Sequence, residues 1–390
     1  MKLKPVHIFL FIVLCVAAAV LISLLRKDSE ATAGINQCTP IKEGLTNNLS
    51  GWLVYESRNE NKESFAFDLG TKTTLQLDHL TVDTLIGPSK AGLLTYYDYA
   101  QNAWVVADLT RQTQGSVLNI EQATPIAWIG ERLLIGSDRL QLFDPSSGKA
   151  DDLIPDVEFP KIDNEMDWSA KLNWGGYSPF RIVPSPDLSR LAFVASGEPA
   201  VSLLVWDRQN ARALAQLHWV DTQTAPQWSP DGSGVLSSAP PSISYQQKLY
   251  INVTDHLPYV GGNDLMYAGV DGSIRRLTTF SSFARAVESR YVWSPDGSQI
   301  ASVVDFMVNG ADIQRVAVIA FTTEGVTTFC LPSATAEVSG FPVWSPDGRT
   351  IALAIRDGDA PLQTYAVDVG SGAALRLDSD AQIVGWWRSP

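Results

Sequence analysis

One five-residue string, Trp-Ser-Pro-Asp-Gly, recurs in the second half of this chain and constrains its fold more than any other feature. It occurs three times, at 228–232, 293–297 and 344–348. A degenerate copy, Pro-Ser-Pro-Asp-Leu, occupies 184–188, and a fragment, Trp-Arg-Ser-Pro, ends the sequence at 387–390. Each complete copy follows a short extended stretch and precedes an apolar run typical of a strand. The sequence is therefore an internal repeat of β units.

The residues of the repeat have the chemistry of a tight turn between two strands. Ser, Pro, Asp and Gly stand in the order that a type I turn prefers, and Gly supplies the left-handed conformation that often closes a hairpin. The Trp before the turn is large enough to fill the space between neighbouring sheets, which explains much of the count of 12 Trp. We predict a structural role for all of these residues. They are Trp228, Pro230, Asp231, Gly232, Trp293, Pro295, Asp296, Gly297, Trp344, Pro346, Asp347 and Gly348.

The repeat resembles the TolB-type, WD-like propeller repeat, which also occurs in the propeller domains of prolyl oligopeptidase relatives. The resemblance covers about residues 51–390, strongly over the last three units and weakly over the first three. It implies an all-β propeller of four-stranded blades around a central channel. Seven runs have the pattern of the second strand of a blade, which predicts seven blades. These runs begin at Trp52, Gly92, Arg132, Arg190, Gly234, Gln299 and Thr350.

The two ends of the propeller are predicted to meet in one blade. The stretch 46–51, just before Trp52, is a turn sequence, so the first blade lacks an inner strand. The stretch 382–390 has the pattern of an inner strand with no blade after it. We expect this C-terminal strand to complete the first blade, because closure removes free sheet edges.

The N-terminal segment has the pattern of a membrane anchor. Ile8–Leu25 is an unbroken apolar run of 18 residues, about 27 Å long as a helix and close to the hydrocarbon thickness. The run exceeds the apolar core of most signal peptides, but Ala31-Thr32-Ala33 has the spacing of a cleavage site, which leaves secretion as the alternative. We expect a short cytoplasmic tail (1–7), one transmembrane helix (8–25), a linker (26–46) and an extracytoplasmic propeller (47–390).

Charge and cysteine content narrow the possible partners. The formal net charge is -13, of which residues 1–30 contribute +2, so the rest of the chain carries -15. An acidic body disfavours nucleic acid, which proteins bind through basic faces. The three Cys and four His form no metal-like motif, and we expect no metal or other cofactor. Cys38 and Cys330 either form a disulfide in an oxidising compartment or stay as two unpaired thiols.

Two long insertions are predicted on one face of the propeller. One spans about 156–178, between the third and fourth blades, and the other about 241–263, inside the fifth blade. Long loops on a rigid scaffold are common binding sites, and exposed aromatic rings beside polar groups suit a protein or carbohydrate contact. The same rings could instead pack the loops onto the blades. The candidate binding residues are Asp163, Glu165, Asp167, Trp168, Trp174, Tyr177, Tyr245, Tyr250, His256 and Tyr259.

Catalysis has little support in the sequence. Prolyl oligopeptidase relatives carry a hydrolase domain with a Gly-x-Ser-x-Gly motif, which this chain lacks, and 27–50 is too short for the extra α/β domain of TolB. We therefore expect a non-catalytic scaffold that binds a protein or a glycan at the cell envelope. The alternative is a hydrolase or lyase that acts on glycan or peptide through acidic residues of the loop face. A sensor is a third alternative, which the lack of a cytoplasmic domain disfavours.

Overall fold

The structure is a computed structural model. It describes residues 37–45, 49–57, 64–77, 86–89, 91–98, 101–111, 113–120, 123–136, 140–153, 182–195, 202–210, 212–218, 220–221, 224–240, 262–282, 285–308, 311–323, 325–379 and 381–387. The predicted anchor, 8–25, lies outside these ranges. Within them, no helix has the length and apolar character needed to cross a membrane.

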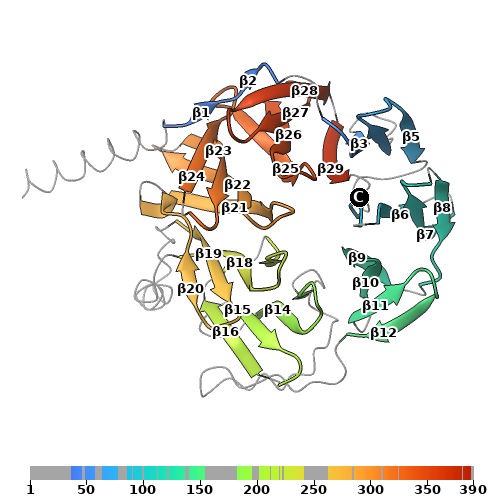
Figure 1. The fold of residues 1–390 in the computed structure, drawn as a ribbon. Helices are drawn as coiled ribbons and strands as arrows, with labels where there is room; N and C mark the ends of the chain where they lie inside the picture. The colour runs from blue at the N-terminus through green and yellow to red at the C-terminus, as the bar shows by residue number, and fades with distance from the viewer. Residues whose placement is uncertain are drawn as a thin grey trace, which may run out of the picture.

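Seven sheets surround a central axis, which confirms the prediction of an all-β, seven-bladed propeller (Figure 1). Each of the seven predicted runs forms a strand of a different sheet. Blade 1 contains β29 (Ala381–Trp387), β3 (Trp52–Ser57), β4 (Ser64–Asp68) and β5 (Thr74–Leu77); blade 2 contains β6 (Leu93–Asp98), β7 (Ala103–Asp108) and β8 (Thr113–Val117); blade 3 contains β9 (Thr124–Ile129), β10 (Arg132–Gly136), β11 (Leu140–Asp144) and β12 (Lys149–Asp152).

The other four blades follow in chain order. Blade 4 contains β13 (Ile182–Pro184), β14 (Arg190–Ala195), β15 (Ser202–Asp207) and β16 (Arg212–His218); blade 5 contains β17 (Gln227–Trp228), β18 (Gly234–Ala239), β19 (Asp264–Gly269) and β20 (Ile274–Arg276); blade 6 contains β21 (Arg285–Trp293), β22 (Gln299–Val308), β23 (Ala311–Ala320) and β24 (Gly325–Cys330); blade 7 contains β25 (Ala336–Trp344), β26 (Thr350–Asp357), β27 (Gln363–Asp368) and β28 (Ala373–Ser379). A short 3-10 helix, η3 (Phe280–Ser282), connects blades 5 and 6.

The ring closes as predicted, through the C-terminal strand. β29 pairs antiparallel with β3, with Trp387 opposite Trp52, and the two strands lie side by side in Figure 1. The indole nitrogen of Trp386 also donates to the carbonyl oxygen of Ser50 at 3.0 Å. The first and last strands of the propeller therefore share one sheet.

The number of strands per blade differs from the uniform four that the repeat implies. Among the described residues, four sheets have four strands, two have five and one has three. The extra strands are β1 (Thr39–Pro40) and β2 (Lys42–Glu43), which pair in parallel with β24 and β28. In blade 2, a single bridge from Ile86 to Thr95 stands where an inner strand was expected. Part of the predicted linker therefore covers the outer edges of blades 6 and 7.

Each copy of the repeat forms the same hydrogen-bonded turn. In blade 7 the Ser345 hydroxyl donates to Asp347 at 2.6 Å, and the backbone N–H of Thr350 donates to that hydroxyl at 3.0 Å. The same two contacts form at Ser185, Ser229 and Ser294. The last turn position has φ of 72°, 72° and 68° at Gly232, Gly297 and Gly348, and 63° at Leu188. The turn thus needs the left-handed conformation even in the copy without Gly.

The Trp of each complete repeat joins its blade to the preceding one. Trp228, Trp293 and Trp344 are all at most 8% exposed. Their indole nitrogens donate across the blade boundary, to the carbonyl oxygens of Val183 (2.8 Å), Gln227 (3.4 Å) and Val292 (3.1 Å), respectively. These bonds link the inner strands of blades 4 to 7 in series, while the rings fill the space between the sheets.

Candidate functional site

The candidate binding residues from the sequence, Asp163 to Tyr259, all lie outside the described residues. The strands that flank them are described. The insertion 154–181 connects β12 to β13, and 241–261 connects β18 to β19. In an antiparallel blade, the connection between the second and third strands and the connection to the next blade share one face, opposite the repeat turns. We call this the loop face, and both insertions attach to it.

The described part of the loop face contains a cavity of about 460 Å³ between blades 2 and 3. Its walls come from two connections: the β6–β7 turn and the segment that leads from β8 to β9. Aromatic, amide, hydroxyl and aliphatic side chains line it, and none of the described lining residues is Lys, Arg, His, Asp or Glu. The lining residues are Tyr97, Asn102, Ala103, Trp104, Leu118, Asn119, Ile120, Ala123 and Thr124.

Local contacts fix the aromatic side of this cavity. The rings of Tyr97 and Trp104 meet edge to face, with centroids 5.3 Å apart. The Tyr97 hydroxyl donates to the side-chain oxygen of Asn102 at 2.8 Å. Asn102 has φ of 50°, a left-handed turn conformation that Asn tolerates better than most residues. The ring contact and the hydrogen bond hold the side chains of Tyr97, Trp104 and Asn102 in one arrangement without a ligand.

The floor of the cavity is part of the propeller core. Leu118 and Ile120 are buried, and the backbone N–H of Leu118 donates to the carbonyl oxygen of Trp104 at 2.7 Å. The same apolar side chains pack in a cluster that reaches Leu133 and Phe143 of blade 3. The cavity was missed in the sequence because its residues belong to no motif. The only signal in the sequence is weak: an Asn-Ala-Trp stretch at 102–104 and a further Asn at position 119.

A second polar cluster lies at the base of the 241–261 insertion, between blades 5 and 6. Asp264, the first residue of β19, is fully buried and forms an ion pair with Arg276 at 2.7 Å. It also accepts a hydrogen bond from the backbone N–H of Ser281 at 3.0 Å. The hydroxyl of Thr278 lies 2.6 Å from Glu288 and 3.4 Å from Asp264. This cluster ties the start of β19 to η3 and β21.

Glu288 is the unusual member of this cluster. It is fully buried on β21, and burial, with the negative charge of Asp264 acting in the same direction, raises its pKa to about 8; the Thr278 hydrogen bond opposes this shift. Its Oε1 atom has no hydrogen-bond partner among the described residues. A carboxyl group in this environment is protonated at neutral pH. Asp264, Thr278 and Glu288 are shielded from solvent, so the first role of the cluster is structural.

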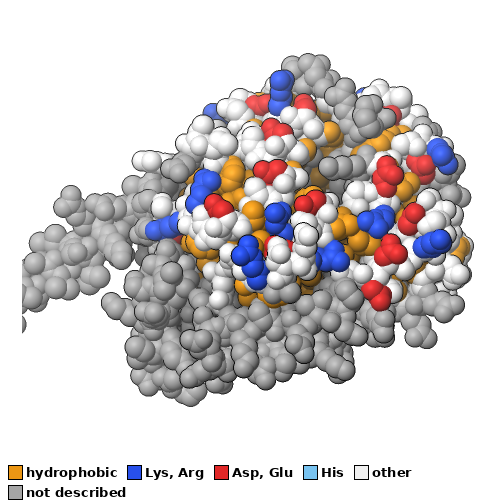
Figure 2. All heavy atoms as spheres, turned by 60° about the horizontal axis from the view of Figure 1, so that its bottom comes forward, with side chains coloured by type: hydrophobic (Ala, Val, Ile, Leu, Met, Phe, Trp, Pro, Cys, Tyr) orange, Lys and Arg blue, Asp and Glu red, His pale blue; other side chains and the backbone are white. Residues whose placement is uncertain are grey.

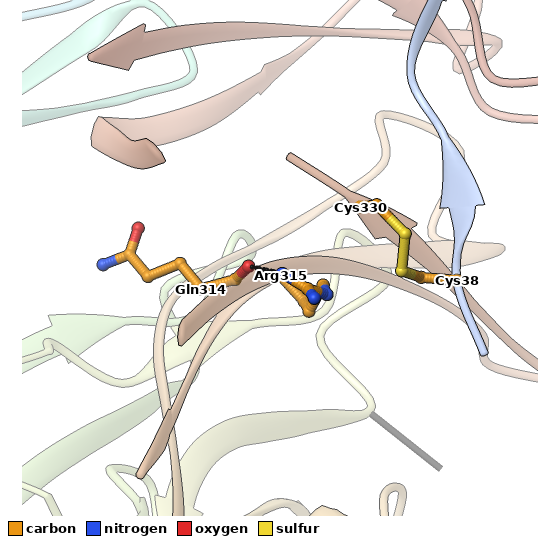
Figure 3. The surroundings of a disulfide bond; sticks show 4 residues. All are labelled: Cys38, Gln314, Arg315 and Cys330. Atoms are coloured by element: carbon orange, nitrogen blue, oxygen red, sulfur yellow. Dashed lines mark hydrogen bonds between the residues drawn. A yellow bond between two sulfur atoms is a disulfide. The ribbon is translucent and has the colours of Figure 1, made fainter. Parts of the chain in front are cut away.

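The disulfide between Cys38 and Cys330 joins the N-terminal strand to blade 6 (Figure 3). The two Cα atoms are 5.2 Å apart. Cys330 ends β24, and Arg315 lies opposite it on β23. Burial lowers the pKa of Arg315. The bond holds β1 on the outer edge of blade 6, next to the pairing of Pro40 with Cys330.

Charge is mixed over the visible surface. On the side shown in Figure 2, acidic and basic side chains alternate, and neither sign gathers into a continuous patch. Among the described residues, no group of three or more His, Cys, Asp or Glu is arranged to hold a metal ion.

Comparison with known proteins identifies the fold. No protein-family model and no curated protein sequence matches the chain. Among solved structures, TolB from Acinetobacter baumannii is similar at 14% identity and a TM-score of 0.41, over 83% of this chain and 79% of that one. The oligogalacturonate lyase from Vibrio parahaemolyticus is similar at 14% identity and a TM-score of 0.50, over 87% and 86%. A puromycin-hydrolyzing peptidase from Mycobacterium tuberculosis is similar at 13% identity and a TM-score of 0.50, over 88% of this chain and 56% of that one.

The chain has a TolB-like propeller fold. This agrees with the resemblance seen in the repeat, and the likeness extends to the fold alone. The two neighbours with a TM-score of 0.50 are a lyase and a peptidase, and a shared fold does not by itself assign an activity.

Proposed function

We propose that this protein is a membrane-anchored, extracytoplasmic scaffold that binds a protein or a glycan of the cell envelope through its loop face, without catalysing a reaction. The observation that carries the proposal is the shared location of three features. The cavity between blades 2 and 3 and both long insertions, 154–181 and 241–261, belong to one face of a closed ring. Variable loops gathered on a rigid scaffold are a common design for recognition.

The ring below that face has the rigidity that such a scaffold needs. The β29–β3 pairing closes it, and the indole hydrogen bonds of Trp228, Trp293 and Trp344 join its inner strands. A preorganised surface loses little conformational entropy on binding. The cavity walls also rest on buried core residues, so they share this rigidity.

The disulfide supports the extracytoplasmic location. Bonds such as Cys38–Cys330 persist in oxidising compartments and are rare in the cytosol. The apolar run 8–25 precedes it in the sequence with enough length for one membrane span. A propeller outside the membrane, held by an N-terminal helix, accommodates both features.

A hydrolase or lyase is the second candidate, and Glu288 is the observation in its favour. A carboxyl group with a pKa near neutrality is typical of a general acid, and Glu288 lies at the base of the 241–261 insertion with a pKa raised to about 8. Two structural neighbours are a lyase and a peptidase. The complete burial of the Glu288 side chain argues against direct contact with a substrate.

The decisive experiment is affinity capture of the full-length protein from its native membranes, with mass spectrometry of the captured material. The control variant lacks residues 160–178 and must keep the melting temperature of the parent. We expect a partner that the parent captures and the variant loses. Equal capture by both would contradict a role for that insertion.

Point variants separate binding from catalysis. If the protein is a scaffold, truncation of Trp168 or Trp174 weakens capture of the partner. Neutralising Asp163, Glu165 or Asp167 then changes no turnover, because the parent has none. In an enzyme, one of those neutral variants loses turnover of a glycan or peptide substrate and keeps its fold. Such a loss would overturn the proposed function.

A further inference from the structure

We propose that the cavity between blades 2 and 3 binds one neutral pyranose ring of a glycan. This inference rests on the proposed binding function and names the class of ligand. It does not depend on the two insertions, because the described lining residues belong to blade 2, to the segment that leads into blade 3, or, for Thr124, to the start of β9.

The aromatic wall matches the apolar face of a sugar. Axial C–H groups give a pyranose ring one apolar side, and aromatic rings that carry a polar atom suit such amphipathic partners. Trp104 and Tyr97 supply two rings at fixed orientation, 5.3 Å apart and inclined by 74°. Both side chains are partly exposed.

The polar groups of the cavity match hydroxyl groups rather than ions. Asn102 uses its side-chain oxygen for the Tyr97 hydroxyl, which leaves both amide hydrogens for a ligand. Within the described residues, no hydrogen bond engages the side chains of Asn119 or Thr124, which are exposed at the rim. Amides and hydroxyls both donate and accept, as the hydroxyl groups of a sugar require.

The charge of the ligand follows from the described lining residues, none of which is Lys, Arg, His, Asp or Glu. A uronate or a phosphate would find no Arg or Lys among these residues to pair with, in a chain with a net charge of -13. A neutral sugar has no charge to desolvate there. The cavity volume of about 460 Å³ lies within the usual range of small-molecule sites.

Saturation-transfer NMR on the full-length protein tests the proposal directly. The probes are maltotriose, cellotriose, mannotriose and chitotriose as neutral glycans, trigalacturonate as the acidic one, and an uncharged tripeptide that contains Tyr as the rival class. Two variants remove the contacts, Trp104→Ala from the aromatic wall and Asn119→Ala from the rim. Because Trp104 also contacts the core, only the Asn119 variant is expected to keep the full stability of the parent.

The matched control is Phe341→Ala, which truncates an aromatic side chain that is 46% exposed on blade 7, away from the cavity. We expect at least one neutral trisaccharide to bind. Its affinity falls about tenfold in each cavity variant and stays unchanged in the control.

Three results would overturn the inference: no neutral trisaccharide binds, the acidic glycan or the tripeptide binds in preference, or the neutral glycan binds to Asn119→Ala and Trp104→Ala as tightly as to the parent. The outcome of the capture experiment with the 160–178 deletion is independent of all three results. Failure of the cavity proposal is therefore distinguishable from failure of the scaffold.

Discussion

The indole nitrogen of Trp344 lies 3.1 Å from the carbonyl oxygen of Val292 and donates a hydrogen bond to it, from the inner strand of blade 7 to the inner strand of blade 6. The ring itself is 5% exposed and packs with Ile351, Leu353 and Val338. One side chain thus supplies both the apolar filling and a polar link between two blades. The repeat places the same link at three successive boundaries.

Trp344→Phe is expected to lower the free energy of unfolding by about 2–3 kcal/mol. The hydrogen bond accounts for about 1 kcal/mol, and the cavity left by the smaller ring for the rest. Urea titration followed by circular dichroism measures the change. Phe341→Leu, on the exposed side of the same strand, is the control and should stay within about 0.5 kcal/mol of the parent. An unchanged urea midpoint in Trp344→Phe would mean that the link adds nothing to stability.

The buried carboxyl of Glu288 predicts a stability that falls as pH rises. Its pKa is about 8 in the folded protein, against an ordinary value of 4.5 for a glutamate in water. Between these values the unfolded chain binds fewer protons, so the group's full contribution is present below about pH 4.5 and is lost as pH approaches 8. The Thr278 hydroxyl donates to Glu288 at 2.6 Å and lies 3.4 Å from Asp264, so one hydroxyl hydrogen serves two buried carboxyl groups.

Glu288→Gln should therefore be more stable than the parent at pH 8 and nearly equal to it at about pH 5. The amide keeps the shape of the protonated acid and has no charge to bury. Melting temperatures across this range give the comparison, with Glu131→Gln, in an exposed turn, as the control. Parallel pH profiles for the parent and Glu288→Gln would show that Glu288 does not titrate in this window.

The cross-link between Cys38 and Cys330 predicts a large effect of reduction. The two residues are 292 positions apart, and the chain-entropy model assigns about 5 kcal/mol to the closure of so long a loop. Cys38→Ser should lower the melting temperature, and a reductant should lower that of the parent but not that of the variant. Cys15→Ser is the matched control, because it removes the one Cys outside the disulfide. A parent that melts at the same temperature with and without reductant would contradict the prediction.

The parts of the fold that could be predicted are those with a repeating local signal. The second strands and the closing strand each combine an apolar run with turn residues, and a run such as Thr350–Asp357 has enough residues to show its pattern. β1 and β2 have two residues each, too few for any periodicity. They were missed because their pairing depends on the disulfide and on neighbours more than 280 residues away.

The polar sites could not be predicted for a different reason. The cavity joins Tyr97 and Trp104 to Asn119 through packing of two separate connections. The pair Asp264 and Glu288 meets across a blade boundary, with Thr278 between them. No local sequence pattern indicates contacts between residues so far apart in the chain, since each residue taken alone is typical of a strand or a loop.

Deletion of residues 382–390 is expected to unfold the protein or make it aggregate. The deletion removes nearly all of β29, together with the buried side chains of Ile383, Trp386 and Trp387. It also exposes β3 as an unpaired edge, which is a template for association with other chains. Deletion of 388–390 alone leaves β29 whole and is the matched control. Thermal unfolding and light scattering compare the two forms with the parent. If the longer deletion keeps the melting temperature of the parent, closure by β29 is dispensable, and the remaining six interfaces between blades hold the ring without it.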